Sequence, residues 1–194
     1  MKKQNRSLLG RLCIVFGICL LAAAAVTLFA WQSGMRNSAR QTAACVQTLR
    51  ELLPEVQGAI REERTDPSMP VLSLNGTDYV GILELPGHAS ALPVCAEWGH
   101  LYKQPCRFGG SIYDGTMQIG GTSQKGQYAF YRDISVGDAV YFTDMTGNRY
   151  AYTVKDIRYG KRTDQAALTQ EDAALVLFIK NIYAFEYVMV YCDA

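Results

Sequence analysis

From Tyr79 to the C-terminus, short apolar segments alternate with turn-forming residues, and this pattern limits what the chain can fold into. The clearest hairpin is residues 138–160, where two β-rich runs flank "DMTGN" and where Gly147 and Asn148 suit a turn. Three further strand candidates are "YVGILELP" at 79–86, "ALPVCAEW" at 91–98 and "TMQIGGT" at 116–122. Seven or eight short strands with few helices predict a mostly β domain, a closed or nearly closed barrel of about 115 residues.

The last segment, "ALVLFIKNIYAFEYVMVYCDA", predicts two neighbouring buried strands at Leu175 to Ile179 and Val188 to Tyr191. A short helical turn capped by Thr169 is expected just before them. The first of these strands ends at Lys180, which suggests the rim of a cleft, because a long cationic side chain can reach water from there. The alternative is that Lys180 is a nucleophile or a ligand-binding charge, since desolvation can depress the pKa of a lysine.

Residues Leu12 to Trp31 form a stretch of twenty residues without a charge. At about 1.5 Å rise per residue, such a helix spans the roughly 30 Å hydrocarbon core of a bilayer. The basic residues around it are Lys2, Lys3, Arg6 and Arg11 before the stretch and Arg36 and Arg40 after it. This bias predicts a single-pass helix with a cytoplasmic N-terminus and an extracytoplasmic main domain. A cleaved signal peptide is the alternative, but its apolar region normally has only about 7 to 15 residues.

These patterns divide the chain into four predicted parts. They are a cytoplasmic tail at 1–11, a transmembrane helix at 12–31, a helical stalk and linker at 32–70, and the β-barrel domain at 71–194. The stalk carries apolar residues near helical spacing, so it is partly amphipathic and suited to packing on the domain. Pro54 either kinks this helix or begins a second one.

Composition excludes several functions. The 19 Lys and Arg residues nearly balance the 18 Asp and Glu residues, so the net charge of +1 offers no field for nucleic acid. No Cys-x-x-Cys or His-Glu-x-x-His spacing occurs, and neither a metal nor another cofactor is expected.

The cysteines fall into two groups. Cys13 and Cys19 lie in the predicted membrane helix, where they are expected to be small apolar fillers. Cys95 and Cys106 enclose a short loop on the extracytoplasmic side, where disulfides persist. They are a candidate disulfide, with two separately buried thiols as the alternative, because spacing alone does not prove a bridge.

The order of these pieces resembles a sortase, of the class B or class D type, a membrane-anchored cysteine transpeptidase of Gram-positive bacteria. The matching segments are "YVGILELPG" with "ALPV" at 79–94, "GGSIYDGTMQIGGT" at 109–122, "FYRDISVGDAVYFTDMTGNRYAYTV" at 130–154 and "LVLFIKNIYAFEYVMV" at 175–190. The third segment is the most specific of the four. The resemblance implies a sortase-like barrel that covers nearly the whole chain from residue 79.

Sortase chemistry, as the resemblance implies it, requires a cysteine thiolate, a histidine and an arginine at one end of the barrel. Each has a physical role: the nucleophile ionises, the histidine handles a proton near neutral pH, and the arginine stabilises an oxyanion. In this sequence, the histidine position is Thr122, the cysteine position is Lys180 and the arginine position is Tyr187. The predicted triad is therefore absent, and no catalytic residue is assigned.

Catalysis by residues outside the three sortase positions is not expected. His88 and His100 are the only histidines, and a loop histidine near Cys95 and Cys106 is more often a bystander. Cys192, on the last strand, is expected to be buried. The resemblance places a peptide groove beside residues that are candidates for ligand binding: Lys180, Tyr183, Phe185 and Tyr187.

The sequence thus predicts a catalytically inactive, membrane-anchored sortase-like protein that binds a peptide or a surface-protein partner during cell-surface anchoring or assembly. A groove without a nucleophile can still bind an extended peptide through backbone pairing and side-chain pockets. Two alternatives stay open. One is an active transpeptidase that attaches surface proteins to the cell wall, and the other is a structural subunit of a membrane complex.

Overall fold

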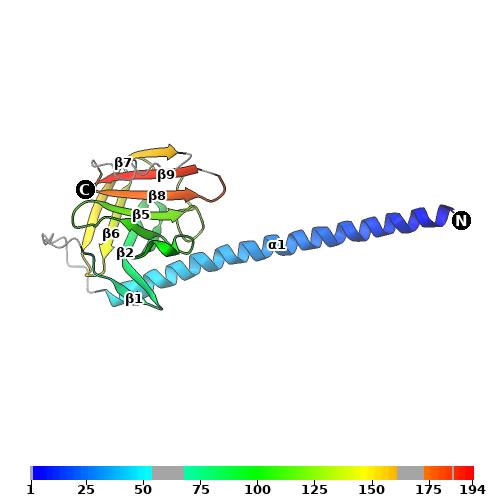
Figure 1. Cartoon of the computed structure of the whole chain (residues 1–194), viewed down its shortest axis with the longest axis horizontal. Coiled ribbons are helices and arrows are strands. Elements are labelled where there is room, and N and C mark those ends of the chain that lie inside the picture. The colour runs from blue at the N-terminus through cyan, green and yellow to red at the C-terminus, as the bar shows by residue number, and fades with distance from the viewer. Residues whose placement is uncertain (1, 54–67, 161–172, 185) are drawn as a thin grey trace. The chain divides into compact units, whose positions relative to one another are not determined.

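The computed structural model describes residues 2–53, 68–160, 173–184 and 186–194 (Figure 1). The chain separates into two compact units, Met1–Asn37 and Ser38–Ala194. A single helix, α1 (Lys2–Leu52), supplies the first unit and continues into the second. Among the residues whose side chains the structure describes, no helical stretch is both long enough and apolar enough to span a bilayer.

The second unit is a β-barrel. Its strands are β1 (Leu72–Leu74), β2 (Thr77–Leu85), β3 (Ser90–Cys95), β4 (Cys106–Gly109), β5 (Met117–Thr122), β6 (Ala139–Asp144), β7 (Arg149–Gly160), β8 (Leu175–Asn181) and β9 (Glu186–Asp193). They pair in the order β1-β2-β3-β4-β5-β8-β9-β7-β6, and β6 pairs again with β2. Strands β2 to β9 therefore form a closed barrel of eight strands, which confirms the predicted mostly β barrel (Figure 1).

Two short 3-10 helices, η1 (Pro86–His88) and η2 (Trp98–His100), connect strands of the barrel. The predicted hairpin at 138–160 is confirmed as β6 and β7, and Gly147 has the positive φ of 86° that its turn requires. The predicted C-terminal strand pair is confirmed as the antiparallel neighbours β8 and β9. Strands β1 and β4 were not predicted, and the expected turn at Thr169 lies outside the described residues.

Both faces of β8 are buried, which explains its continuous apolar run. Leu175, Leu177 and Ile179 point into the barrel core, whereas Val176 and Phe178 pack on the outer face against neighbours that include Met189 and Tyr191 of β9. Strands buried on both faces show apolar runs instead of alternation. Lys180 follows these buried side chains on the outer face of β8 and is itself only partly buried.

The end of α1 belongs to the barrel unit, which begins at Ser38. Val46 and Leu49 of α1 are buried against Tyr79 and Ile82 of β2 and against Met145. Part of the segment predicted as a stalk is thus packed on the barrel by its apolar side chains.

Candidate functional site

The sortase resemblance assigns three positions to catalysis, and these positions lie side by side. They are Thr122, Lys180 and Tyr187. Thr122 ends β5 and is in register with Lys180 of the parallel strand β8. Lys180 is in turn in register with Tyr187 of the antiparallel strand β9. Strand β5 and the C-terminal strand pair, which are far apart in the sequence, therefore meet at one end of the barrel wall. Thr122 is completely buried, so only Lys180 and Tyr187 of the three are accessible to a ligand there.

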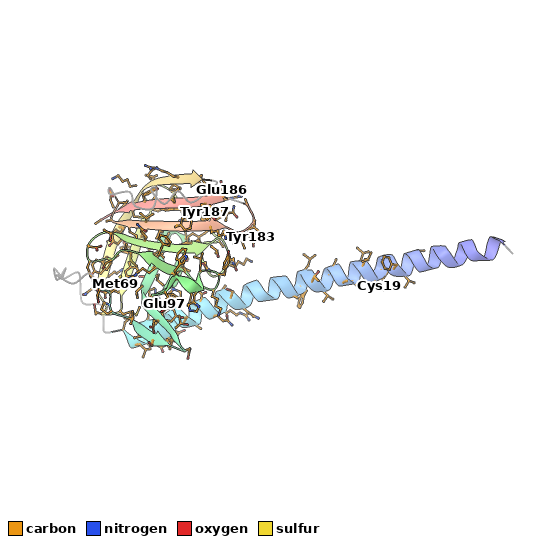
Figure 2. The ribbon with its side chains drawn as sticks, in the orientation of Figure 1. Cys19, Met69, Glu97, Tyr183, Glu186 and Tyr187 are labelled. Carbon is orange, nitrogen blue, oxygen red and sulfur yellow. The ribbon has the colours of Figure 1, made fainter. Side chains whose placement is uncertain are left out.

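A cavity of about 290 Å³ opens beside these positions, around the turn that joins β8 to β9. Figure 2 shows Tyr183, Glu186 and Tyr187 at this end of the two strands. The residues that line the cavity are Tyr102, Lys180, Asn181, Ile182, Tyr183, Ala184, Glu186 and Tyr187. Three of the four predicted groove residues thus face one cavity, while Phe185 lies outside the described residues.

The ammonium group of Lys180 is held by an aromatic residue from a distant loop. Lys180 Nζ donates a hydrogen bond of 2.6 Å to the Tyr102 hydroxyl and lies 5.1 Å from the centre of that ring. This hydrogen bond raises the pKa of Lys180, and desolvation, which lowers it, is the smaller effect. Of the two alternatives from the sequence, this contact favours a ligand-binding charge, because a nucleophilic lysine needs a depressed pKa. Lys180 is a cation at the rim of the cavity.

Tyr102 is a site residue that sequence reasoning missed, because 78 residues separate it from Lys180 in the sequence. Its loop is held against β5 by Gln127, which accepts a hydrogen bond from the Thr122 amide at 2.8 Å and donates one to Leu101 O at 3.1 Å. Gly120 lets Trp98 approach, since a Cβ at Gly120 would lie 2.2 Å from the Trp98 ring. No local sequence signal encodes this convergence.

Asn181 fixes the turn after Lys180 through a buried hydrogen-bond network. The Asn181 side-chain nitrogen donates a hydrogen bond to the Tyr131 hydroxyl at 2.9 Å. The Asn181 side-chain oxygen accepts one from the Tyr183 backbone amide at 3.0 Å. The Ser123 hydroxyl accepts from the Ile182 amide at 3.1 Å. Because these bonds join the turn to the barrel, the cavity wall is preorganised for a ligand.

Tyr187 lines the cavity and is stacked on Phe178, a residue that is not part of the lining. The rings of Phe178 and Tyr187 are stacked, with centroids 5.1 Å apart and planes 16° apart. Tyr187 thus presents a fixed ring next to the Lys180 cation, and this combination suits a ligand with both apolar and anionic groups.

Among the described residues that line this cavity there is no cysteine, serine, threonine or histidine. Cys192 is buried in the barrel core, and burial raises the pKa of its thiol to about 12. His88 Nε2 lies 3.0 Å from Asp138 Oδ2, and its ring stacks on Phe130 with ring centroids 4.9 Å apart. Within the described part of the chain, no hydrogen bond joins an imidazole ring to a thiol.

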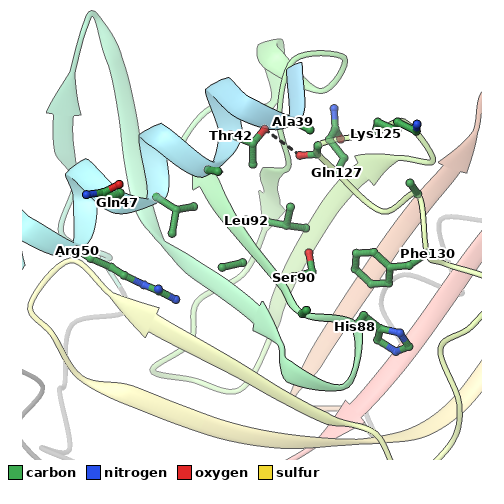
Figure 3. A pocket seen from close by; sticks show the side chains of 16 residues that line it. Ala39, Thr42, Gln47, Arg50, His88, Ser90, Leu92, Lys125, Gln127 and Phe130 are labelled. Carbon is green, nitrogen blue, oxygen red and sulfur yellow. Dashed lines mark hydrogen bonds between the residues drawn. The ribbon is translucent and has the colours of Figure 1, made fainter. Parts of the chain in front are cut away.

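A second cavity, of about 640 Å³, lies between the end of α1 and the barrel. Figure 3 shows His88 and Phe130 on one side of it and Thr42, Gln47 and Arg50 of α1 on the other. Thr42 donates a hydrogen bond of 3.0 Å to Gly126 O, which joins the helix to the loop after β5. Among the described residues, no group of three or more His, Cys, Asp or Glu side chains is placed to hold a metal.

Cys95 and Cys106 lie next to each other at the ends of two parallel strands. They are register partners of β3 and β4, and both are completely buried free thiols in the structure. The predicted bridge between them stays a prediction.

Comparison with known proteins identifies the fold. No family model matches the sequence, and no curated protein matches it. Sortase A from Corynebacterium diphtheriae superposes with a TM-score of 0.52 at 18% identity over 60% of each chain. Sortase C1 from Streptococcus agalactiae gives a TM-score of 0.52 at 17% identity, over 62% of this chain and 69% of that one.

Sortase A from Listeria monocytogenes gives a TM-score of 0.50 at 17% identity, over 59% of this chain and 86% of the enzyme. The chain therefore spans less than two thirds of the diphtheria enzyme but most of the Listeria enzyme. Together with the closed eight-stranded barrel, these matches show that the chain has a sortase-like fold, as predicted. The matches named here are to sortases A and C, and the class B or class D type stays a prediction.

Proposed function

We propose that this protein is a membrane-anchored, extracytoplasmic sortase-like protein that binds an extended peptide and does not cleave it. One observation carries the proposal: the strand-end position that the resemblance assigns to the nucleophile is Lys180, whose ammonium is hydrogen-bonded to Tyr102. A lysine with a raised pKa keeps its proton, so it has no lone pair for attack on a carbonyl carbon.

The ligand is a peptide of cell-surface proteins that carries a carboxylate next to an apolar side chain. The Lys180 ammonium at the rim of the cavity supplies the cation for the carboxylate. The Tyr187 ring, fixed against Phe178, supplies the apolar contact. Both groups come from the rigid end of the β8–β9 pair, so binding requires little ordering of the protein.

The transpeptidase alternative is tested with residues 38–194, which include the whole compact unit of the barrel. This fragment is incubated with sorting-signal peptides and an amine nucleophile, and products are followed by mass spectrometry. No ligated product is expected. A product that disappears in Cys192→Ala would overturn the proposal and establish an active enzyme.

Peptide binding separates the binding role from a structural one. The dissociation constant of the same peptides is measured for the wild-type fragment and for Lys180→Ala and Tyr187→Ala. Each substitution is expected to weaken binding about tenfold, which corresponds to about 1.4 kcal/mol. Lys155→Ala is the matched control, because Lys155 pairs with Asp193 at 3.1 Å and does not line the cavity. Equal effects of Lys180→Ala and Lys155→Ala would contradict the proposed site.

The membrane anchor is proposed at Leu12 to Trp31, which has no charged residue. In the described part of this stretch, α1 exposes large apolar side chains. These are Ile14, Val15, Phe16, Ile18, Leu20, Leu21, Val26, Leu28 and Phe29. Exposed apolar side chains on a helix suit contact with lipid. The full chain is expected to stay in the membrane fraction after alkaline washing, whereas residues 38–194 are expected in the supernatant. Release of the full chain by the wash would contradict the anchor.

A further inference from the structure

Two opposite charges line the cavity at the end of β8 and β9. They are the ammonium group of Lys180 and the carboxylate of Glu186. Figure 2 shows Glu186 next to Tyr187 at the start of β9. The peptide contacts proposed above use Lys180 and Tyr187, and they give no role to Glu186.

The two charges project from opposite faces of the strand pair. Lys180 is in register with Tyr187, whereas Asn181 is in register with Glu186. Register partners share a face of the sheet, and successive residues of a strand project from opposite faces. Asn181 is buried and donates to the Tyr131 hydroxyl, so Glu186 lies on the inner side of the strand ends and Lys180 on the outer side. The cavity therefore has one charge on each side of these strand ends.

Glu186 has no cationic partner within the described part of the chain. None of the ion pairs there includes it, and the Lys180 ammonium is hydrogen-bonded to Tyr102 instead. Glu186 Oε2 accepts a hydrogen bond from Asn181 Nδ2 at 3.4 Å, which is long for an N–H···O bond with a usual length of about 2.9 Å. Its carboxylate thus keeps most of its capacity to accept hydrogen bonds.

A carboxylate in this position favours a cation from the ligand. Glu186 is partly buried, so it has lost some of its contact with water. A cation that binds there offsets this loss of hydration, whereas a second anion would be repelled. Among cationic side chains, the guanidinium group of arginine fits a carboxylate best, because it can donate two parallel hydrogen bonds.

We propose that Glu186 determines specificity by binding an arginine side chain of the peptide whose carboxylate is bound by Lys180. This inference rests on the proposed function and narrows its ligand to a peptide segment that carries both charges. The charges belong to different residues of the peptide, because Lys180 and Glu186 project from opposite faces. An apolar residue between them contacts the Tyr187 ring, which lines the same cavity.

The size of the cavity agrees with a short segment. Its volume of about 290 Å³ lies at the lower end of the range of ligand sites, which begins at about 300 Å³. The site is therefore expected to recognise an acidic, an apolar and a basic residue in succession and to make few contacts with the rest of the peptide.

The test measures the binding of tripeptides to the full chain in detergent micelles by isothermal titration calorimetry. The probes are acetyl-Asp-Leu-Arg-amide and the reverse sequence acetyl-Arg-Leu-Asp-amide. Each is compared with a peptide in which citrulline, a neutral analogue of similar shape, replaces arginine. For the sequence order that binds more tightly, the wild type is expected to bind the arginine peptide about tenfold more tightly than the citrulline peptide.

Glu186→Gln is expected to bind the two peptides equally, because glutamine keeps the acceptor oxygen for Asn181 and removes the charge. Lys180→Ala is expected to weaken the binding of both peptides and to keep the preference for arginine. Glu97→Gln is the matched control, since Glu97 is exposed and does not line the cavity, and it is expected to keep the tenfold preference. Circular dichroism checks that each variant is folded.

Two results would overturn this inference and leave the proposed function intact. One is an unchanged preference for arginine in folded Glu186→Gln. The other is a wild type without this preference whose binding of the citrulline peptide still depends on Lys180. If none of the peptides bound to the wild type, both the inference and the proposed function would be wrong.

Discussion

At the scale of single residues, Lys180 determines which chemistry the barrel end can support. Lys180 lies near the end of the buried strand β8, and its ammonium group donates a hydrogen bond to the Tyr102 hydroxyl. A thiol at the same position would ionise near neutral pH beside a suitable base, whereas the ammonium remains charged and binds anions. The same backbone position therefore favours binding over catalysis.

Two buried tyrosines of the same segment predict opposite effects of losing a hydroxyl. Tyr128 OH is buried and has no hydrogen-bond partner among the described residues, whereas Tyr131 OH accepts from Arg132 Nε and Asn181 Nδ2, both at 2.9 Å. Tyr128→Phe is expected to leave the free energy of unfolding unchanged or to raise it by about 1 kcal/mol. Tyr131→Phe is expected to lower it by about 1–2 kcal/mol. Chemical denaturation measures both values, and a larger loss in Tyr128→Phe would contradict this expectation.

Asp138 predicts a loss of stability in acid. The Ser135 amide donates to its carboxylate at 2.9 Å, and this bond, followed by the His88 contact at 3.0 Å, lowers the pKa of Asp138. A carboxyl whose pKa is lower in the folded state stabilises the protein above its unfolded value of about 3.9 and loses this effect as the pH falls through the folded value. The stability advantage of the wild type over Asp138→Asn is therefore expected to shrink between about pH 5 and pH 2. If the difference in unfolding free energy between the wild type and Asp138→Asn stayed constant over this range, ionisation of Asp138 would not contribute to stability.

At the scale of elements, β2 closes the barrel because it pairs with both β3 and β6. Gly81 is in register with Val94 of β3 and with Asp144 of β6. A Cβ at Gly81 would lie 2.2 Å from a ring carbon of Phe142 and 2.6 Å from Thr143 O. Glycine in a strand often marks such a close approach of another chain segment.

Gly81→Ala is therefore expected to destabilise the barrel by about 1–3 kcal/mol, because the Phe142 ring and the β6 backbone must move. Gly87→Ala is the matched control, since a Cβ at Gly87 would have no atom within 4 Å. Thermal unfolding of both variants measures the difference. Equal stability of the two would mean that β2 and β6 separate without cost.

At the scale of the whole molecule, the folded unit extends beyond the barrel to the C-terminal part of α1. Leu49 is completely buried against the barrel, whereas Leu52 on the same helix is 54% exposed. The helix thus contributes to the core of the unit that begins at Ser38.

Leu49→Ala is expected to lower the free energy of unfolding of residues 38–194 by about 2–5 kcal/mol, because it leaves a cavity between helix and barrel. Leu52→Ala, a change of the same size at an exposed position, is expected to change it by no more than about 0.5 kcal/mol. Urea denaturation measures both variants. A small effect of Leu49→Ala would mean that the helix is dispensable for the barrel.

Much of the barrel follows from local sequence patterns. The hairpin at 138–160 and the strand pair at the C-terminus were predictable, because apolar runs and turn residues act over a few neighbouring positions. Strands β1 and β4 were not, because strands of 3 and 4 residues carry too little periodicity for recognition.

The sequence by itself determined the strands of five or more residues, the barrel class and the lysine at the end of β8. Only the tertiary structure decided the register that aligns Thr122 with Lys180, the approach of Tyr102 to that lysine, and the packing of Leu49 against β2. The physical reason is that strand formation depends on adjacent residues, whereas these contacts exist only after the barrel closes and packs against its helix.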